Sequence, residues 1–73
     1  MLLLYKFLSM LDSKVNVNVH FINYPYGELR YIGLARKFHE WQLYNSFFDC
    51  YVMKIGIDSD GTLHINAQSK DFF

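Results

Sequence analysis

The sequence has a single cysteine, a single proline and no excess of charge of either sign. The lone cysteine, Cys50, cannot form an internal disulfide, which suits a reducing compartment such as the cytosol. Seven basic and seven acidic residues give a formal net charge of +0. Nucleic-acid-binding proteins usually carry a basic excess, because neutralising phosphates supplies much of their affinity. The charge balance therefore argues against a nucleic-acid partner, and equally against an acidic mimic of nucleic acid.

Long hydrophobic runs are also missing. The most apolar stretch, MLLLYKFLSML at residues 1–11, is too short to span a bilayer. It contains Lys6, lacks a basic segment ahead of it, and is followed by Asp12, Ser13 and Lys14 rather than by a small-residue cleavage site. We therefore expect a core helix here, a cytoplasmic protein and no membrane contact.

Motifs for metal or catalytic chemistry are absent at their usual spacings. The sequence has no glycine-rich phosphate loop and no paired carboxylates placed for acid–base work. The three histidines and Cys50 show no C-x2-C or H-x3-H spacing of a zinc site. Cys50 beside a strand is more typical of a small buried apolar residue than of a nucleophile. We expect neither an enzyme nor a bound cofactor or metal.

The most motif-like stretch is DSDG, Asp58–Gly61. A helix-loop-helix calcium loop needs oxygen ligands at its first and last positions and a glycine at the sixth. With Gly61 at the sixth position, Gly56 and Ala67 fall at the first and last positions, and neither has a side-chain oxygen. As a hairpin turn the letters fit, because Asp58 can bond the backbone two residues on and Gly61 can adopt a positive φ. The stretch predicts a turn between two strands.

Alternating apolar residues predict four strands, at residues 15–21, 29–35, 51–57 and 62–67. The first alternation is strict, and it places small polar residues on the opposite face. The alternation at residues 29–35 is weaker, so its register stays open. The apolar side of the first strand consists of Val15, Val17, Val19 and Phe21, and the polar side of Asn16, Asn18 and His20.

Helical spacing appears in two places. Residues 2–11 carry Leu4, Phe7, Leu8 and Leu11 at helical intervals, and residues 35–45 place Phe38, Trp41 and Tyr44 on one stripe. The element order is then α-β-β-α-β-β. We predict one α+β domain over residues 1–73, with a small antiparallel four-stranded sheet and helices mainly on one face.

The ends of the chain, LLYKFLSMLDSKVNVNVHF and VMKIGIDSDGTLHI, resemble a group of small uncharacterised accessory proteins of phages and prophages of Gram-positive bacteria. That group combines a leucine-rich helix, an alternating valine strand and a C-terminal Asp-x-Asp-Gly hairpin. The resemblance implies a protein of the host-cell cytoplasm, and it supplies no catalytic residue. The middle, residues 24–50, departs from the group by being more aromatic and basic. The matching residues are Tyr5, Leu8, Leu11, Asp12, Val15, Val17, Val19, Val52, Ile55, Ile57, Asp58, Gly61, Leu63 and Ile65.

Apolar residues make up 52% of the chain and aromatic residues 19%. A domain of this size buries only about 60% of the surface that its unfolded chain exposes. Some apolar surface should therefore remain outside and serve self-association, as a homodimer, or partner contact. Tyrosine, tryptophan and arginine dominate interface energetics, and the central segment is rich in them. The predicted partner-binding residues are Tyr24, Tyr26, Arg30, Tyr31, Arg36 and Lys37, while Trp41 is either core or interface.

These features favour a non-enzymatic protein that binds a host or viral protein. Its most specific form is a phage inhibitor of a bacterial defence complex, such as an anti-CRISPR protein. One alternative is a nucleic-acid module that stacks bases on Tyr24, Tyr26, Tyr31 and Trp41 beside its basic residues. Two others are a nucleotide-binding sponge formed between protomers and a virion or assembly component.

Overall fold

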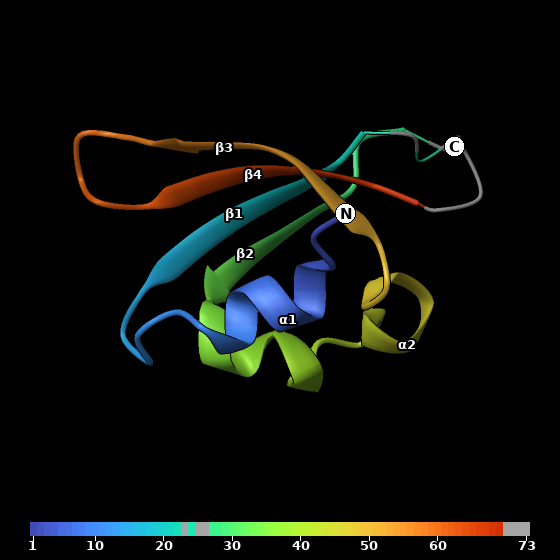
Figure 1. Cartoon of the computed structure of the whole chain (residues 1–73), viewed down its shortest axis with the longest axis horizontal. Coiled ribbons are helices and arrows are strands. Elements are labelled where there is room, and N and C mark those ends of the chain that lie inside the picture. The colour runs from blue at the N-terminus through green and yellow to red at the C-terminus, as the bar shows by residue number, and fades with distance from the viewer. Residues whose placement is uncertain (23, 25–26, 70–73) are drawn as a thin grey trace.

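The computed structural model describes residues 1–22, 24 and 27–69 of the chain. A four-stranded sheet carries its helical segments on one face (Figure 1). The α+β class and the one-sided placement of the helices are as predicted. The elements are α1 (Leu4–Ser9), β1 (Asn16–Phe21), β2 (Arg30–Leu34), the 3-10 helix η1 (Ala35–Glu40), α2 (Tyr44–Phe47), β3 (Tyr51–Ile57) and β4 (Leu63–Gln68).

The sheet is mixed, with the strand order β2-β1-β4-β3. The pairs β1–β2 and β3–β4 are antiparallel, but the two central strands, β1 and β4, run parallel. The predicted antiparallel sheet is therefore wrong at its centre. The two hairpins meet through β1 and β4 because these strands carry the least exposed side chains. Such strands are buried best at the centre of the sheet, with a strand on each side and the helical layer above them.

The core lies between the sheet and the helical segments. Val17 and Val19 of β1 and Ile65 of β4 are fully buried, and Leu4 of α1 closes over them. Burial of each such side chain contributes roughly 1.5–3 kcal/mol. The prediction that the alternating apolar residues of β1 face the core is thus confirmed. The full core is Leu4, Leu8, Val17, Val19, Phe21, Tyr31, Ala35, Phe38, Cys50, Ile65 and Ala67.

The register of β2, which the sequence left open, is fixed by Tyr31. Its side chain faces the helices and is 7% exposed, and its hydroxyl donates a hydrogen bond to the Leu34 carbonyl oxygen at 2.6 Å. Gly33 lies on the same side, where an added Cβ would come within 3.2 Å of the Tyr31 hydroxyl oxygen. The other side chains of β2, among them Ile32, consequently point away from the helices.

The predicted helix at residues 35–45 is wrong as a single element. The 3-10 helix η1 ends at Glu40, Trp41 is extended with φ −67° and ψ 137°, and α2 follows as a separate turn. The break lets the Trp41 ring stack on Phe21 of β1, with ring centroids 5.4 Å apart. The aromatic stripe does face the core, but from two short segments.

Helix α1 is also shorter than predicted, because the residues before it join the sheet. The Leu4 N–H donates to the Cys50 carbonyl oxygen at 2.8 Å, and the Val52 N–H donates to the Leu2 carbonyl oxygen at 2.8 Å. Leu3 forms an isolated antiparallel bridge with Tyr51. At the other end, Leu11 bonds back only three residues, to Leu8, which tightens the last turn.

Aromatic rings fill the space between sheet and helices. Tyr31 packs on Phe38 and Trp41 with centroid distances of 5.2 and 5.5 Å, and Phe38 packs on Tyr44 at 5.2 Å. Every aromatic side chain among the described residues is buried or half-buried. The apolar surface that remains outside is aliphatic instead. Within the described part of the chain, no helix is long and apolar enough to cross a membrane.

Candidate functional site

The face of the sheet without helices is the first candidate surface. It has a grid of side chains in cross-strand register: Arg30 opposite His20, Ile32 opposite Asn18, and Asn18 in turn opposite His64. We call it the open face. Its residues are Arg30, Ile32 and Leu34 on β2, Asn16, Asn18 and His20 on β1, His64 and Asn66 on β4, and Lys54 and Gly56 on β3.

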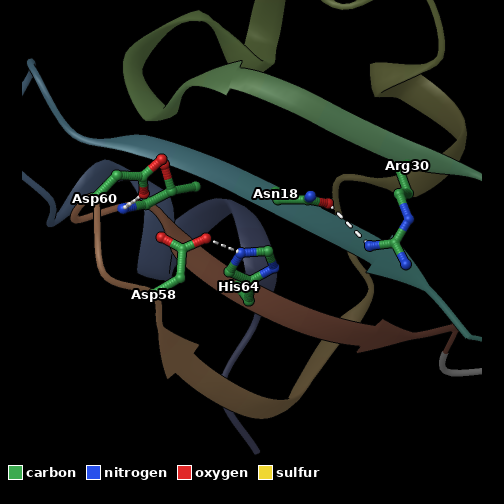
Figure 2. A network of polar contacts seen from close by, with 6 residues as sticks. Asn18, Arg30, Asp58, Asp60 and His64 are labelled. Atoms are coloured by element: carbon green, nitrogen blue, oxygen red, sulfur yellow. Dashed lines mark hydrogen bonds and ion pairs between the residues drawn. The ribbon is translucent and has the colours of Figure 1, made fainter.

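Arg30 lies across two strands of the open face. Its Nη1 donates to Asn18 Oδ1 at 3.0 Å (Figure 2). Its Nε donates to Glu28 Oε1 at 2.5 Å. The guanidinium is thus held at two points, one on the neighbouring strand, although it stays accessible to solvent. A side chain fixed before binding loses less conformational entropy when a partner arrives.

A second polar group lies at the β3–β4 turn. His64 Nε2 and Asp58 Oδ2 are 2.5 Å apart, and both side chains are exposed (Figure 2). A hydrogen bond with the Asp58 side chain and another from the Thr62 backbone N–H lower the pKa of Asp60 from its ordinary value. The contact between Asp58 and His64 joins the turn to β4 and so aligns the hairpin.

The turn itself is the predicted hairpin. The Asp58 N–H donates to the Thr62 carbonyl oxygen at 3.1 Å, and Gly61 has the positive φ of +88°. One detail was wrong: Asp60, and not Asp58, accepts from the backbone two residues on, with its Oδ1 3.0 Å from the Thr62 nitrogen. The Asp58 carboxylate turns to His64 instead. Among residues 1–22, 24 and 27–69, no three His, Cys, Asp or Glu side chains gather as a metal-binding group.

The residues predicted to bind a partner do not form one surface. Arg30 lies on the open face, whereas Arg36 and Lys37 lie exposed on η1, on the helical side of the sheet. Tyr31 is in the core, so it offers little surface. Tyr24 is half-buried and meets the Phe47 ring edge-on at 6.1 Å. Tyr26 falls outside the described residues.

Arg36 borders a small hollow between α1 and η1. Its volume is about 170 Å³, below the roughly 300–1,000 Å³ typical of ligand pockets. The sequence had not suggested it, since its walls come from two distant segments. The lining residues are Tyr5, Leu8, Ser9, Ala35, Arg36, Phe38, His39 and Tyr44.

Two sets of exposed aliphatic side chains were missed by sequence reasoning. Ile32 is 69% exposed at the centre of β2, on the open face. Ile55 and Ile57 of β3 are 44% and 71% exposed, although they point to the helical side with Leu63 and Ile65. The β3–β4 hairpin extends past the helices, so that its end has no helical cover (Figure 1). Alternation alone cannot reveal where a helical layer stops.

No protein-family model matches this chain, and the curated proteins and solved structures also gave no match. The function must therefore be argued from the surface itself. The likeness of the chain ends to phage and prophage proteins stays a prediction.

Proposed function

We propose that this chain is a binding protein without catalytic activity, which docks on a host or viral protein through the β2 side of the open face. The observation that carries the proposal is Ile32. It is 69% exposed, in the middle of a strand, beside Arg30 and opposite Asn18. Covering a large aliphatic side chain in that position with a partner removes apolar surface from water, which lowers the free energy of the complex.

The energetics favour a protein partner. Covering an exposed isoleucine contributes up to about 1.5–3 kcal/mol. Arg30, two residues along the strand, already has its guanidinium fixed by Glu28 and Asn18. Arginine is among the residues enriched in interface hot spots, so Arg30 beside the apolar Ile32 suits a contact with a protein. Tyr24 and Tyr26 remain predicted partner contacts, but the Tyr24 ring meets Phe47 of α2 on the helical side and does not lie on the open face.

The nucleic-acid alternative has less support. Two of its four stacking rings, those of Tyr31 and Trp41, pack against one another at 5.5 Å inside the domain. Stacking of unpaired bases needs ring faces that are open to solvent. The open face does carry Arg30, Lys54 and two histidines, so the test below includes a nucleic-acid arm. The sponge and the virion component have no observation in their favour.

The phage setting rests on the resemblance of the chain ends. If it applies, the partner is a component of a bacterial defence complex in the host cytoplasm. We expect expression of the chain in a bacterium with an active CRISPR–Cas system to raise the survival of a targeted plasmid. A plasmid loss equal to that of an empty-vector strain would contradict this specific form.

The docking face is tested by a matched pair of substitutions. Ile32→Asn removes the proposed anchor, and Met10→Asn changes a methionine of similar exposure, 70%, at the end of α1. With proteins captured from bacterial lysate and identified by mass spectrometry, we expect Ile32→Asn to weaken capture by roughly 1–3 kcal/mol. The Met10→Asn variant should bind as the parent does.

Arg30→Ala should weaken the same capture, and Tyr24→Ala should do so where the partner also reaches the helical side, on which Tyr24 meets Phe47. Melting temperatures show whether each variant stays folded. A partner that Ile32→Asn retains and Met10→Asn loses would place docking on the helical side. Nuclease treatment that abolishes capture would favour the nucleic-acid alternative.

A further inference from the structure

The outer edge of β3 is covered along only half of its length. Leu2 and Leu4 bond to Val52 and Cys50, so the first residues of β3 already have neighbours on both sides. From Met53 to Ile57, no strand among the described residues pairs with this edge, since β3 is the last strand of the sheet.

The direction of the free backbone groups follows from the ladder. The Asp58 N–H donates to the carbonyl oxygen of Thr62, the residue just before β4, and bonded residues alternate along an antiparallel strand. Gly56 and Lys54 therefore also bond to β4, and the N–H and C=O groups of Ile55 and Ile57 point outward. The irregularity between Val52 and Lys54 shifts this alternation by one residue, in agreement with the outward bond that Val52 makes to Leu2.

This edge, which no other described strand pairs with, is also apolar. Ile55 and Ile57 are 44% and 71% exposed beside it. Natural edge strands usually avoid pairing through charges, prolines or cover. Here the one charged residue of β3 is Lys54, at the start of the open part, so the edge is suited to adding another strand.

We propose that the added strand is β3 of a second copy of this chain, antiparallel, with the two-fold axis at Gly56. Ile55 then faces the partner's Ile57, and these two outward-pointing residues exchange backbone hydrogen bonds. Symmetry repeats the pair on the other side of the axis. The result joins two four-stranded sheets edge to edge.

Charge selects this register. An axis at Gly56 sets Lys54 opposite the partner's Asp58 twice, in positions where side chains of opposed strands come close. The Asp58 carboxylate already contacts His64 through Oδ2, so Lys54 would add a second contact to the same carboxylate. An axis at Ile55 would set Lys54 opposite the partner's Gly56. An axis at Ile57 would run Ile55 against the partner's turn at Ser59. A two-fold axis between two residues would set a residue whose backbone N–H and C=O point outward opposite a partner residue whose N–H and C=O point to β4, so the two could not exchange hydrogen bonds.

Length and shape agree with the same register. The paired segment ends where Lys54 meets the partner's Asp58, beyond which Leu2 already covers Val52. At the axis two glycines face each other, and an added Cβ on Gly56 would meet nothing within 4 Å of its own chain. Directly opposed residues share a face of the sheet, so both helical layers lie on one side. The four isoleucines fill the strip between the layers.

The other edge of the sheet, β2, is less suited to self-pairing. Its Leu34 carbonyl already accepts from Tyr31, and pairing about Ile32 would set Arg30 against the partner's Leu34. The proposed dimer therefore leaves the docking face around Ile32 accessible. It stands whether or not that docking proposal is correct.

Single cysteines test the register. Gly56→Cys brings two thiols face to face at the axis, at a Cα separation near the ~4.5 Å of such pairs, which a disulfide can span. Lys54→Cys faces Asp58 instead and is the matched control. Under mild oxidation, we expect Gly56→Cys to form a covalent dimer and Lys54→Cys to stay uncrosslinked. Cys50, 2% exposed, remains in both variants, and the parent protein controls for it.

Charge reversal provides a second readout on the whole chain. Lys54→Asp should weaken the dimer roughly tenfold, since two attractive pairs become repulsive, and adding Asp58→Lys should restore it. Sedimentation would measure the dissociation constants, and circular dichroism would verify folding. A mass of one chain at all micromolar concentrations would overturn the proposal. So would a dimer that crosslinks through position 54 but not through position 56.

Discussion

The Tyr31 hydroxyl donates a hydrogen bond to the carbonyl oxygen of Leu34, three residues along the same strand, at 2.6 Å. The bond passes over Gly33, whose missing side chain makes room for it. It fixes both the inward position of the ring and the outward position of Ile32. The interior of the domain and its proposed docking face therefore depend on the same three residues.

Tyr31→Phe should change the response of stability to alkali. Burial, and then the negative charge of Glu40, raise the pKa of Tyr31 in the folded protein above its ordinary value. The folded chain therefore keeps the Tyr31 proton at a pH where the unfolded chain has lost it. The contribution of Tyr31 to the free energy of unfolding is present in full below about pH 10 and falls as the pH rises further. Denaturant unfolding across this range should show a steeper loss for the parent than for Tyr31→Phe. Equal slopes would mean that Tyr31 is not shielded. At neutral pH the variant should lose about 1 kcal/mol with its hydrogen bond.

Gly33→Ala should cost more stability in the parent than in the Tyr31→Phe background. The new Cβ would lie 3.2 Å from the Tyr31 hydroxyl oxygen and 3.5 Å from the ring carbon that bears it. Removing the oxygen leaves only an ordinary contact. A double-mutant cycle by chemical denaturation would measure a coupling of roughly 0.5–3 kcal/mol. Additive effects would show that the ring moves aside at no cost.

Ile65→Ala and Ile32→Ala should separate core from surface. Ile65 of β4 is fully buried in the core between the sheet and the helical segments, so its truncation leaves a cavity and should cost about 2–5 kcal/mol. Ile32 is mostly in water, and its truncation should stay within about 0.5 kcal/mol. Thermal unfolding of both variants makes the comparison. A large loss for Ile32→Ala would mean that this side chain packs on something within the folded protein.

Gly61→Ala should destabilise the hairpin by about 1 kcal/mol, because φ is +88° and a Cβ is disfavoured there. Gly56→Ala is the matched control in the same hairpin, with open space around the new methyl group. Its stability should stay the same or rise, since alanine restricts the unfolded chain more than glycine does. Hydrogen exchange at the β3–β4 ladder would report the local effect. Equal behaviour of both variants would contradict a strained turn.

The sequence predicted local pattern well and spatial arrangement less well. Strand β1 and the turn at Gly61 follow from alternation and turn chemistry, which act over a few residues. The parallel pairing of β1 with β4 depends on how two hairpins meet, and no local signal encodes that contact. The break in the helix at Trp41 also depends on a contact between distant residues. Stacking of the Trp41 ring on Phe21 favours an extended backbone at Trp41, although the local spacing of apolar residues favours a continuous helix.

The site was predicted in part. Arg30 lies on the open face as an exposed arginine should, but Tyr31, its neighbour, belongs to the core. The weak alternation of β2 could not distinguish the two faces, because Tyr31 and Ile32 are both large and apolar. At the exposed end of β3 the alternation is clear, and it correctly assigns Ile55 and Ile57 to the helical side of the sheet. Ile57 is nevertheless exposed to water, because the helical layer does not reach that far along the strand.

The pairing of Leu2 with Val52 has a practical consequence for handling the protein. The chain runs antiparallel to β3 here, so residues added ahead of Met1 would continue along the edge towards Lys54 and Ile55. A purification tag at that end could occupy the edge as an extra strand and mimic or block association. Affinity tags therefore belong after Phe73, and a tag ahead of Met1 should be removed before any mass is measured.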